Sequence, residues 1–220
     1  MLKRRVNNET HKSSMFSQKH IDRPLANVDR FPVIAIGGDY GQQNATTFQA
    51  AGLDLVHRKL RGLNEYYHSG RESGKQKAPS RYAKDFVEFV QTLGKQYGMQ
   101  GVRFYLFLDP SAQGLQEEIK RACRIADIPI SIRDADNDVK LGISRVQKAL
   151  TFNIMTVSPK QENAIDEFGV YGYDPKSIEK GKEEPIKVSD HCMDAIRYMV
   201  MGMWKIIKKW LPLSEQEDEK

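Results

Sequence analysis

The stretch Phe31-Pro-Val-Ile-Ala-Ile-Gly-Gly-Asp39-Tyr-Gly41 decides the fold of this chain. Its apolar run from Pro32 to Ile36 is short and rich in β-branched residues, which is typical of a buried strand. Two glycines follow, and after them comes a carboxylate, Asp39. We therefore expect a buried strand that presents Asp39 at its C-terminal end.

A second apolar run, Val102-Arg-Phe-Tyr-Leu-Phe-Leu-Asp109-Pro110, ends in the same way. Two buried strands that each end in an aspartate indicate that two carboxylates meet at one edge of a sheet. Ionised carboxylates at close range repel each other, so such pairs usually share a cation.

The remaining pattern predicts two further strands before the second run, and helices alternating with strands after a helix that begins at Pro79. The expected strands are 32–39, 46–53, 55–67, 102–108, 128–133 and 153–157, and the expected helices begin near residues 79, 111, 138, 159 and 190. The first three strands have short connections, which favours an antiparallel meander. Strand–helix–strand connections require a parallel section. We expect an α/β fold with a mixed central β-sheet, an antiparallel meander plus parallel strands, and helices on both faces.

Composition divides the chain into three parts. Residues 1–30 are polar and basic, which is typical of a flexible arm or an interdomain linker. Residues 31–211 form the expected domain, and residues 212–220 form an acidic tail that we expect to be disordered. The chain of 220 residues has a net charge of +5 and a pI of about 9.1, which mildly favours a polyanionic partner.

The sequence gives no sign of a secreted or membrane protein. Met1-Leu-Lys-Arg-Arg-Val6 leads into polar residues, and the apolar stretch at 195–210 is interrupted by Arg197 and Lys205. Cys123 and Cys192 have no metal-binding or disulfide spacing, and we interpret them as small core residues of an intracellular protein.

A third acidic group lies in the last predicted helix, in the segment Asp190-His191-Cys-Met-Asp194. The spacings of three and four residues place Asp190, His191 and Asp194 on one helix face. Asp190 is equally well interpreted as a plain N-cap, but Asp194 lies too deep in the helix for that role. Together with Asp39 and Asp109, Asp194 completes a set of oxygen ligands suited to Mg²⁺ or Mn²⁺. Two such ions activate a water and stabilise the leaving oxygen of a phosphodiester.

The segment from Ser69 to Ala78 is rich in Gly and Lys and is interpreted as a loop. It is not a nucleotide-binding P-loop, because the glycine spacing is wrong and no Ser or Thr follows Lys75. Two readings stay open: a plain solvated loop and a mobile basic loop that touches a phosphate backbone.

Several blocks, in this order, resemble the C-terminal nuclease domain of tailed-phage terminase large subunits. They are Gly37-Gly-Asp39-Tyr-Gly41, Glu65-Tyr-Tyr67, Leu108-Asp-Pro-Ser-Ala112, Ala135-Asp-Asn-Asp-Val139, and Pro185-Ile-Lys187 leading to Asp190-His-Cys-Met-Asp-Ala-Ile-Arg-Tyr198. The resemblance runs from about residue 32 to 200. It implies an RNase H-like fold, related to resolvases and retroviral integrases, and a metal-dependent endonuclease that cuts concatemeric viral DNA during genome packaging.

The resemblance also assigns roles to residues. It implies that Asp39, Asp109 and Asp194 bind two Mg²⁺ or Mn²⁺ ions, and that His191 binds the second ion or orients a water. Asp138 matches the family block but is sufficiently explained as a helix cap. Lys75, Lys77 and Arg81 are the expected contacts to the DNA backbone.

The partners implied by the resemblance are double-stranded DNA, the terminase small subunit, the portal protein and an ATPase motor. The sequence contains no Walker A motif, so the motor is absent from this chain. The implied location is the cytoplasm of the host bacterium.

Three alternatives remain beside this reading. The same fold serves Holliday-junction resolvases and ribonucleases of the RNase H type. The second alternative is a non-catalytic docking module of a packaging motor. A nucleotide-binding α/β domain is the weakest alternative, because the Gly-rich strand-to-helix fingerprint is missing.

Overall fold

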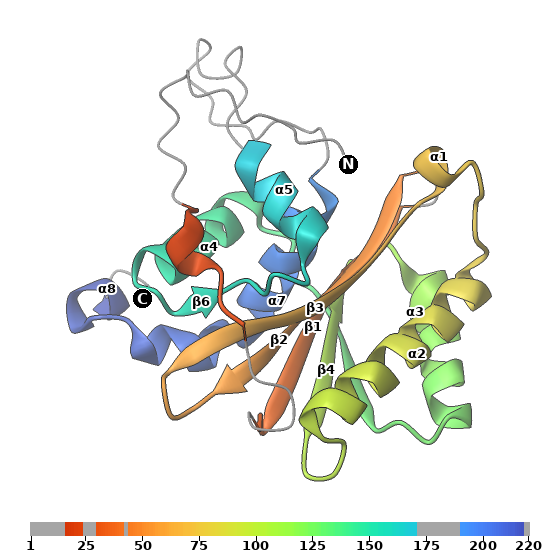
Figure 1. The fold of residues 1–220 in the computed structure, drawn as a ribbon, viewed down its shortest axis with the longest axis horizontal. Coiled ribbons are helices and arrows are strands. Elements are labelled where there is room, and N and C mark those ends of the chain that lie inside the picture. Colours follow the sequence, from red (N-terminus) through yellow and green to blue (C-terminus); the bar gives the residue numbers. More distant parts are fainter. Residues whose placement is uncertain (1–15, 24–29, 42–43, 171–189, 218–220) are drawn as a thin grey trace.

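The computed structural model describes residues 16–23, 30–41, 44–170 and 190–217. Their centre is a twisted six-stranded sheet with the order β5-β4-β1-β2-β3-β6 (Figure 1). The strands are β1 (Val33–Asp39), β2 (Ala45–Asp54), β3 (Lys59–Ser69), β4 (Arg103–Leu108), β5 (Ile130–Asp134) and β6 (Met155–Thr156).

The sheet is mixed, as the sequence predicts. β1, β2 and β3 form the antiparallel meander, whereas β4 pairs in parallel with β1, β5 with β4, and β6 with β3. Gly38 of β1 lies opposite Leu108 of β4. Asp39, the last residue of β1, and Asp109, which directly follows β4, therefore lie side by side at the same edge of the sheet.

Helices cover both faces of the sheet (Figure 1). They are α1 (Gly70–Ser73), α2 (Pro79–Tyr97), α3 (Gln113–Ile125), α4 (Val139–Thr151), α5 (Glu162–Val170), α7 (His191–Ile207) and α8 (Leu213–Glu217). The alternation along β1 separates two cores: Ile34 and Ile36 pack with residues of α2 and α3, whereas Val33 and Ala35 pack with residues of α7. Helices on both faces agree with the prediction.

The described part of the expected basic arm is attached to the domain. Gln18–His20 form a short 3₁₀ helix, and the His20 side chain is fully buried, with Nε2 3.1 Å from the Leu150 carbonyl oxygen. Ile21 continues as a parallel bridge to Val157, and Phe16 stacks on Phe168. Residues 16–23 therefore differ from the flexible linker expected there. Local composition did not indicate this, because the apolar partners belong to distant parts of the chain.

Other boundaries differ by a few residues. β6 is limited to two residues of the expected 153–157, Gly70–Ser73 form a helical turn inside the expected loop, and Leu213–Glu217 of the expected disordered tail form α8. The block Pro185-Ile-Lys187 lies outside the described residues.

Two further expectations concern helix ends and membranes. Asp138 caps α4, since its Oδ1 accepts a hydrogen bond from the Leu141 N–H at 2.9 Å. Within the described ranges, no helix has the length and apolar character needed to cross a bilayer.

Candidate metal and nuclease site

The close approach of α7 to β1 positions the candidate site. A Cβ atom on Gly37 would collide with the carbonyl oxygen of Ala195 in α7, so only glycine allows this contact. Ala195 itself is fully buried. The first turns of α7, which carry His191 and Asp194, are thereby brought to the end of β1 where Asp39 lies.

Asp39 is paired with His191. The Nδ1 atom of His191 lies 2.7 Å from Oδ2 of Asp39 and donates a hydrogen bond to it, and both side chains are mostly buried. The hydrogen bond to Asp39 raises the pKa of His191 above its ordinary value. Nδ1 is therefore engaged, and Nε2 is the ring nitrogen that remains for a water or an ion.

Asp109 is held in place by three donors. Its Oδ1 accepts the Ser111 N–H at 2.7 Å, and its Oδ2 accepts the Tyr198 hydroxyl at 2.8 Å and the Asn137 amide at 3.5 Å. Burial acts to raise the pKa of Asp109, but these hydrogen bonds together hold it below its usual value. Tyr198 lies one turn after Asp194, so α7 also fixes Asp109.

Asp194 is paired within its own helix. Arg197 donates from Nε at 3.2 Å and from Nη2 at 2.9 Å, in both cases to Oδ1. The Arg197 side chain is buried against Gly142 of α4, where a Cβ would collide with it, and its Nη1 has no hydrogen-bond partner. A cation fixed in this way binds the Asp194 carboxylate through one of its two oxygens.

The charges of the aspartates act on one another. Burial raises the pKa of Asp39, with Asp109 and Asp190 adding to the effect and His191 opposing it. Burial likewise raises the pKa of Asp194, with Asp39 and Asp190 adding and Arg197 opposing. Carboxylates that disfavour one another's charge in a buried place mark a site that a cation would stabilise.

The residue types at the site suit a metal ion, but their side chains are not gathered around one point. Within the part of the chain that the structure describes, no group of three or more His, Cys, Asp or Glu side chains is gathered closely enough to hold a metal ion. Each aspartate is instead bound by its own partner: His191, Tyr198 or Arg197. The donor set of carboxylate oxygens with an imidazole at its rim suits a hard divalent cation.

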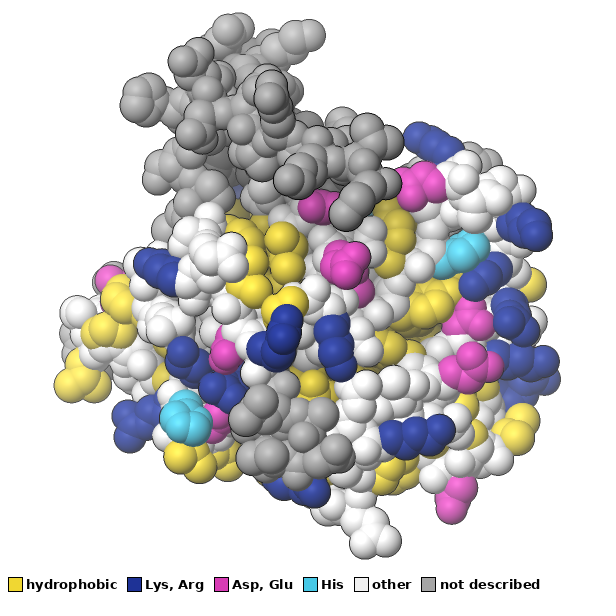
Figure 2. Space-filling model, viewed as in Figure 1, with side chains coloured by type: hydrophobic (Ala, Val, Ile, Leu, Met, Phe, Trp, Pro, Cys, Tyr) yellow, Lys and Arg dark blue, Asp and Glu magenta, His cyan; other side chains and the backbone are white. Residues whose placement is uncertain are grey.

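The structure also shows where the predicted DNA contacts lie. Lys and Arg side chains gather on the side of the molecule formed by α1, the loop after it, and α2 (Figure 2). Lys75 and Arg81 are exposed there. Lys77 is less exposed. Its Nζ lies 2.7 Å from Asp85 Oδ2 and over the rings of Tyr66 and Tyr82, so Lys77 forms an ion pair within the fold.

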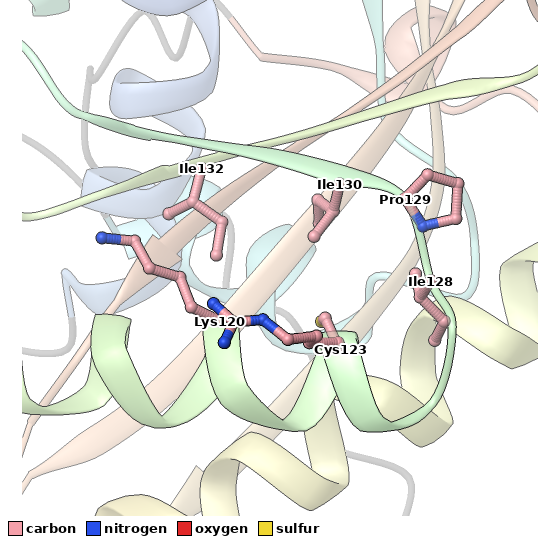
Figure 3. Close-up of a pocket in the computed structure, with 7 residues that line it drawn as sticks. Lys120, Cys123, Ile128, Pro129, Ile130 and Ile132 are labelled. Carbon is pink, nitrogen blue, oxygen red and sulfur yellow. The ribbon is translucent and has the colours of Figure 1, made fainter.

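A pocket of about 380 Å³ lies elsewhere, between α3 and β5 (Figure 3). Its walls include Lys120 and Cys123 from α3 and Ile130 and Ile132 from β5. None of the predicted site residues lines it. This pocket is therefore not the place where the carboxylates act.

Sequence reasoning missed three residues around the site. Tyr198 and Arg197 follow Asp194 by four and three residues, so helical spacing was a usable signal for both. The third, Glu167, accepts the N–H groups of Cys192 and Met193 at the start of α7. No local pattern indicates it, because the acceptor and its donors are separated by 25 and 26 residues. The alternative for Asp190 is corrected at the same time: it occupies the N-cap position without a side-chain capping bond.

Known structures share this fold. The large terminase of a thermophilic bacteriophage superposes with a TM-score of 0.69 at 29% identity, over 86% of this chain and 43% of that one. The P22 large terminase nuclease domain gives 0.62 at 16% identity, over 86% and 90%. The SPP1 large terminase nuclease domain, a structure with bound Mn, gives 0.53 at 18% identity, over 82% and 95%.

This chain thus spans less than half the length of the thermophilic-phage terminase but nearly the whole of the isolated nuclease domains. No protein-family model matches the chain, and no curated protein matches it. The similarity rests on the arrangement of the sheet and helices over more than four fifths of the chain. The resemblance inferred from the sequence is confirmed: the chain has the RNase H-like fold of the nuclease domain of phage terminase large subunits.

Proposed function

We propose that this domain is a divalent-metal-dependent DNA endonuclease that acts in viral genome packaging. The proposal is supported by the position of Asp39 and Asp109 at the ends of adjacent parallel strands, at the edge of the sheet that the first turn of α7 reaches through His191. There, the charge of Asp109 adds to the raised pKa of Asp39, and the charge of Asp39 adds to that of Asp194. Two structures of related fold have bound magnesium and manganese, which supports the choice of ion.

Asp39, Asp109 and Asp194 would hold two Mg²⁺ or Mn²⁺ ions, which supply activation of a water and charge stabilisation for hydrolysis of a phosphodiester. His191 orients the Asp39 carboxylate through Nδ1, and its Nε2 would bind the second ion or orient a water. Tyr198 fixes Asp109, and Arg197 opposes protonation of Asp194. Lys75 and Arg81 contact the DNA backbone, which carries no base information.

The biological setting belongs to the same proposal. The thermophilic-phage relative is a large terminase, and the P22 and SPP1 relatives are large terminase nuclease domains of which this chain covers 90% and 95%. We infer that the domain cuts concatemeric DNA in the host bacterial cytoplasm, together with an ATPase motor, a small subunit and a portal protein.

The test is nicking of supercoiled plasmid with Mn²⁺ or Mg²⁺ by the parent, Asp39→Asn and Asp194→Asn. Loss of the ion ligands should lower the rate at least about a hundredfold, because an amide binds a hard cation far more weakly than a carboxylate. Asp166→Asn, an exposed aspartate on α5, is the matched control and should cut at the parental rate.

Cleavage that survives both substitutions would exclude the site. A parent that prefers branched DNA or an RNA–DNA hybrid over linear duplex would favour the resolvase or ribonuclease alternative. Calorimetry gives the third distinction, because a docking module should bind no Mn²⁺ through the three aspartates.

A further inference from the structure

The first turn of α7 is capped by a residue from another helix. Asp190, at the N-cap position, makes no side-chain capping bond. Glu167 of α5 takes its place: Oε2 accepts the N–H of Cys192 at 2.8 Å and that of Met193 at 3.2 Å. Cys192 and Met193 lie between His191 and Asp194, so Glu167 binds the backbone of the short segment that carries His191 and Asp194.

The position of Glu167 is fixed by its burial and by the packing of α5. Its side chain is buried, with 5% of the residue exposed, and α5 packs on α7 through the buried Ala164 and Phe168. Phe16 stacks on Phe168 with ring centroids 4.4 Å apart. A carboxylate fixed in this way presents its oxygen to α7 at a set position.

The start of α5 is tied to the sheet by a second carboxylate. Glu65 of β3 accepts the Asn163 N–H at 2.7 Å and the Ala164 N–H at 3.2 Å. Glu65 also accepts the Gln49 side-chain amide from β2 at 2.9 Å. The first turn of α5 is therefore bonded to the middle of the sheet, and the first turn of α7 is bonded to α5.

The alternative is that Glu167 only stabilises the fold. Two observations favour a more specific role. Its oxygen bonds the backbone between His191 and Asp194 and no other turn of α7. The remainder of α7 is already fixed by apolar packing and by the Gly37 contact with Ala195. The first turn, by contrast, ends at the helix terminus, where N–H groups lack partners inside the helix.

We propose that Glu167 is a positioning residue of the site, which sets the direction of the first α7 turn so that His191 reaches Asp39. Glu65 supports it by fixing α5 to the sheet. The proposal rests on the proposed nuclease function for its kinetic consequence, while its structural consequence, the His191–Asp39 contact, does not depend on cleavage.

The experiment uses the full chain with three substitutions at one position. Glu167→Gln keeps an acceptor oxygen, Glu167→Asp withdraws it by one methylene, and Glu167→Leu removes it. Burial raises the pKa of Glu167 to about 7, so the neutral amide is a fair substitute for a group that is already partly protonated. Two controls accompany them: Asp166→Asn, exposed beside Glu167 on α5, and Leu115→Ala, buried on the opposite face of the sheet.

Single-turnover plasmid nicking is measured against Mn²⁺ concentration. Glu167→Gln should cut within about threefold of the parent, while Glu167→Leu should be at least tenfold slower and need more Mn²⁺ for half-maximal rate. Glu167→Asp should fall between them. Leu115→Ala, although less stable, should cut at the parental rate below its melting temperature, and so should Asp166→Asn.

An NMR readout separates this proposal from the proposed function. The ¹⁵N resonances of His191 report its hydrogen bond to Asp39 whether or not the protein cuts DNA. They should be unchanged in Glu167→Gln and moved in Glu167→Asp and Glu167→Leu. A folded Glu167→Leu with parental His191 resonances, or equal loss of nicking in Leu115→Ala, overturns the positioning role. If the parent does not cut at all, the proposed function fails and the His191 resonances still decide about Glu167. If Glu167→Leu does not fold, Glu167→Asp decides.

Discussion

The two faces of the sheet treat buried carboxylates in opposite ways. On the side of α2, Asp85 accepts hydrogen bonds from Lys77 and Tyr66 and pairs with Arg81. Burial acts against its charge, yet these partners hold the pKa of Asp85 below its usual value. On the side of α7, burial raises the pKa of Asp39, Asp194 and Glu167, and the partners present do not reverse it.

This difference distinguishes Asp85, whose role is structural, from the carboxylates that we propose to be functional. Asp85 is neutralised by two cations of its own chain, so it contributes to the fold without an outside partner. The charge of Asp190 helps to raise the pKa of both Asp39 and Asp194, and the nearby cations do not compensate for this effect. The two carboxylates therefore have too little positive charge around them. Such a deficit is typical of functional sites, and the divalent ion that we propose here would remove it.

The largest expected effect on stability and nicking comes from breaking the contact between β1 and α7 at Gly37 and Ala195. Gly37→Ala places a Cβ where the Ala195 carbonyl oxygen stands, and that oxygen belongs to helix backbone that cannot turn aside. We expect a loss of unfolding free energy of about 3 kcal/mol or more, and loss of nicking, because α7 must move away from β1. Urea unfolding and plasmid nicking measure the two effects.

Gly114→Ala is the matched control on the other face. Gly114 lies in α3, and a Cβ there meets nothing within 4 Å. Since alanine favours a helix over glycine, this substitution should leave stability equal or raise it by roughly 0.5 kcal/mol, with unchanged nicking. A Gly37→Ala protein as stable as Gly114→Ala would show that α7 does not need the close contact.

Much of this comparison could be predicted from the sequence, since the apolar runs at 32–39 and 102–108 indicated the strands and their terminal aspartates. The cap Asp138 was equally local, because the side chain bonds a group three residues away. The charge balance of the carboxylates was not local. Lys77, which stays a predicted DNA contact, pairs with Asp85 and Tyr66, and that neighbourhood exists only after the meander and α2 pack together.

The capping of α7 also depends on a contact between elements that local sequence does not predict. Asp190 stands where the sequence pattern places an N-cap, and a carboxylate there is a sound local prediction. The structure uses Glu167 instead, from a helix that no periodicity links to residue 190. Side chains that act within one turn are predictable from spacing, whereas those that act between elements depend on tertiary packing.

An intermediate effect is expected in the pH dependence of stability. The pKa of Glu167 is about 7 in the folded protein, above the ordinary value of 4.5. Between these values the folded state binds more protons than the unfolded state, so the contribution of Glu167 to stability is full below about pH 4.5. It is lost as the pH rises through about 7, by up to about 3 kcal/mol.

Urea unfolding between pH 4.5 and 8 measures this slope. Glu167→Gln keeps the acceptor but not the titration, so the difference between parent and variant should fall across this window. Asp85 behaves in the opposite sense: its pKa is lowered, so its contribution is present above the ordinary value of 3.8 and is lost as the pH falls through the folded value. Parallel curves for parent and Glu167→Gln would contradict the assignment of the raised pKa to Glu167.

The smallest expected effect comes from one hydroxyl on each face. Tyr198 donates to Asp109 at 2.8 Å, and Tyr66 donates to Asp85 at 2.7 Å. Replacing either tyrosine by phenylalanine removes a hydrogen bond to a carboxylate, which costs about 1 to 2 kcal/mol of stability. In Tyr66→Phe the cations Lys77 and Arg81 still hold Asp85, so nicking should be unchanged.

Tyr198→Phe should differ from Tyr66→Phe in function although the two cost similar stability. Without the hydroxyl, Asp109 keeps the Ser111 N–H and a long contact to Asn137, so its pKa rises and its Oδ2 loses its fixed direction. A loss of about 1 kcal/mol of orientation corresponds to a rate reduction of about fivefold to tenfold. Nicking rates of the two variants, measured at equal distance from their melting temperatures, decide the matter. Equal rates would mean that Asp109, like Asp85, serves the fold alone, and the contrast between the two faces would then reduce to Asp39 and Asp194.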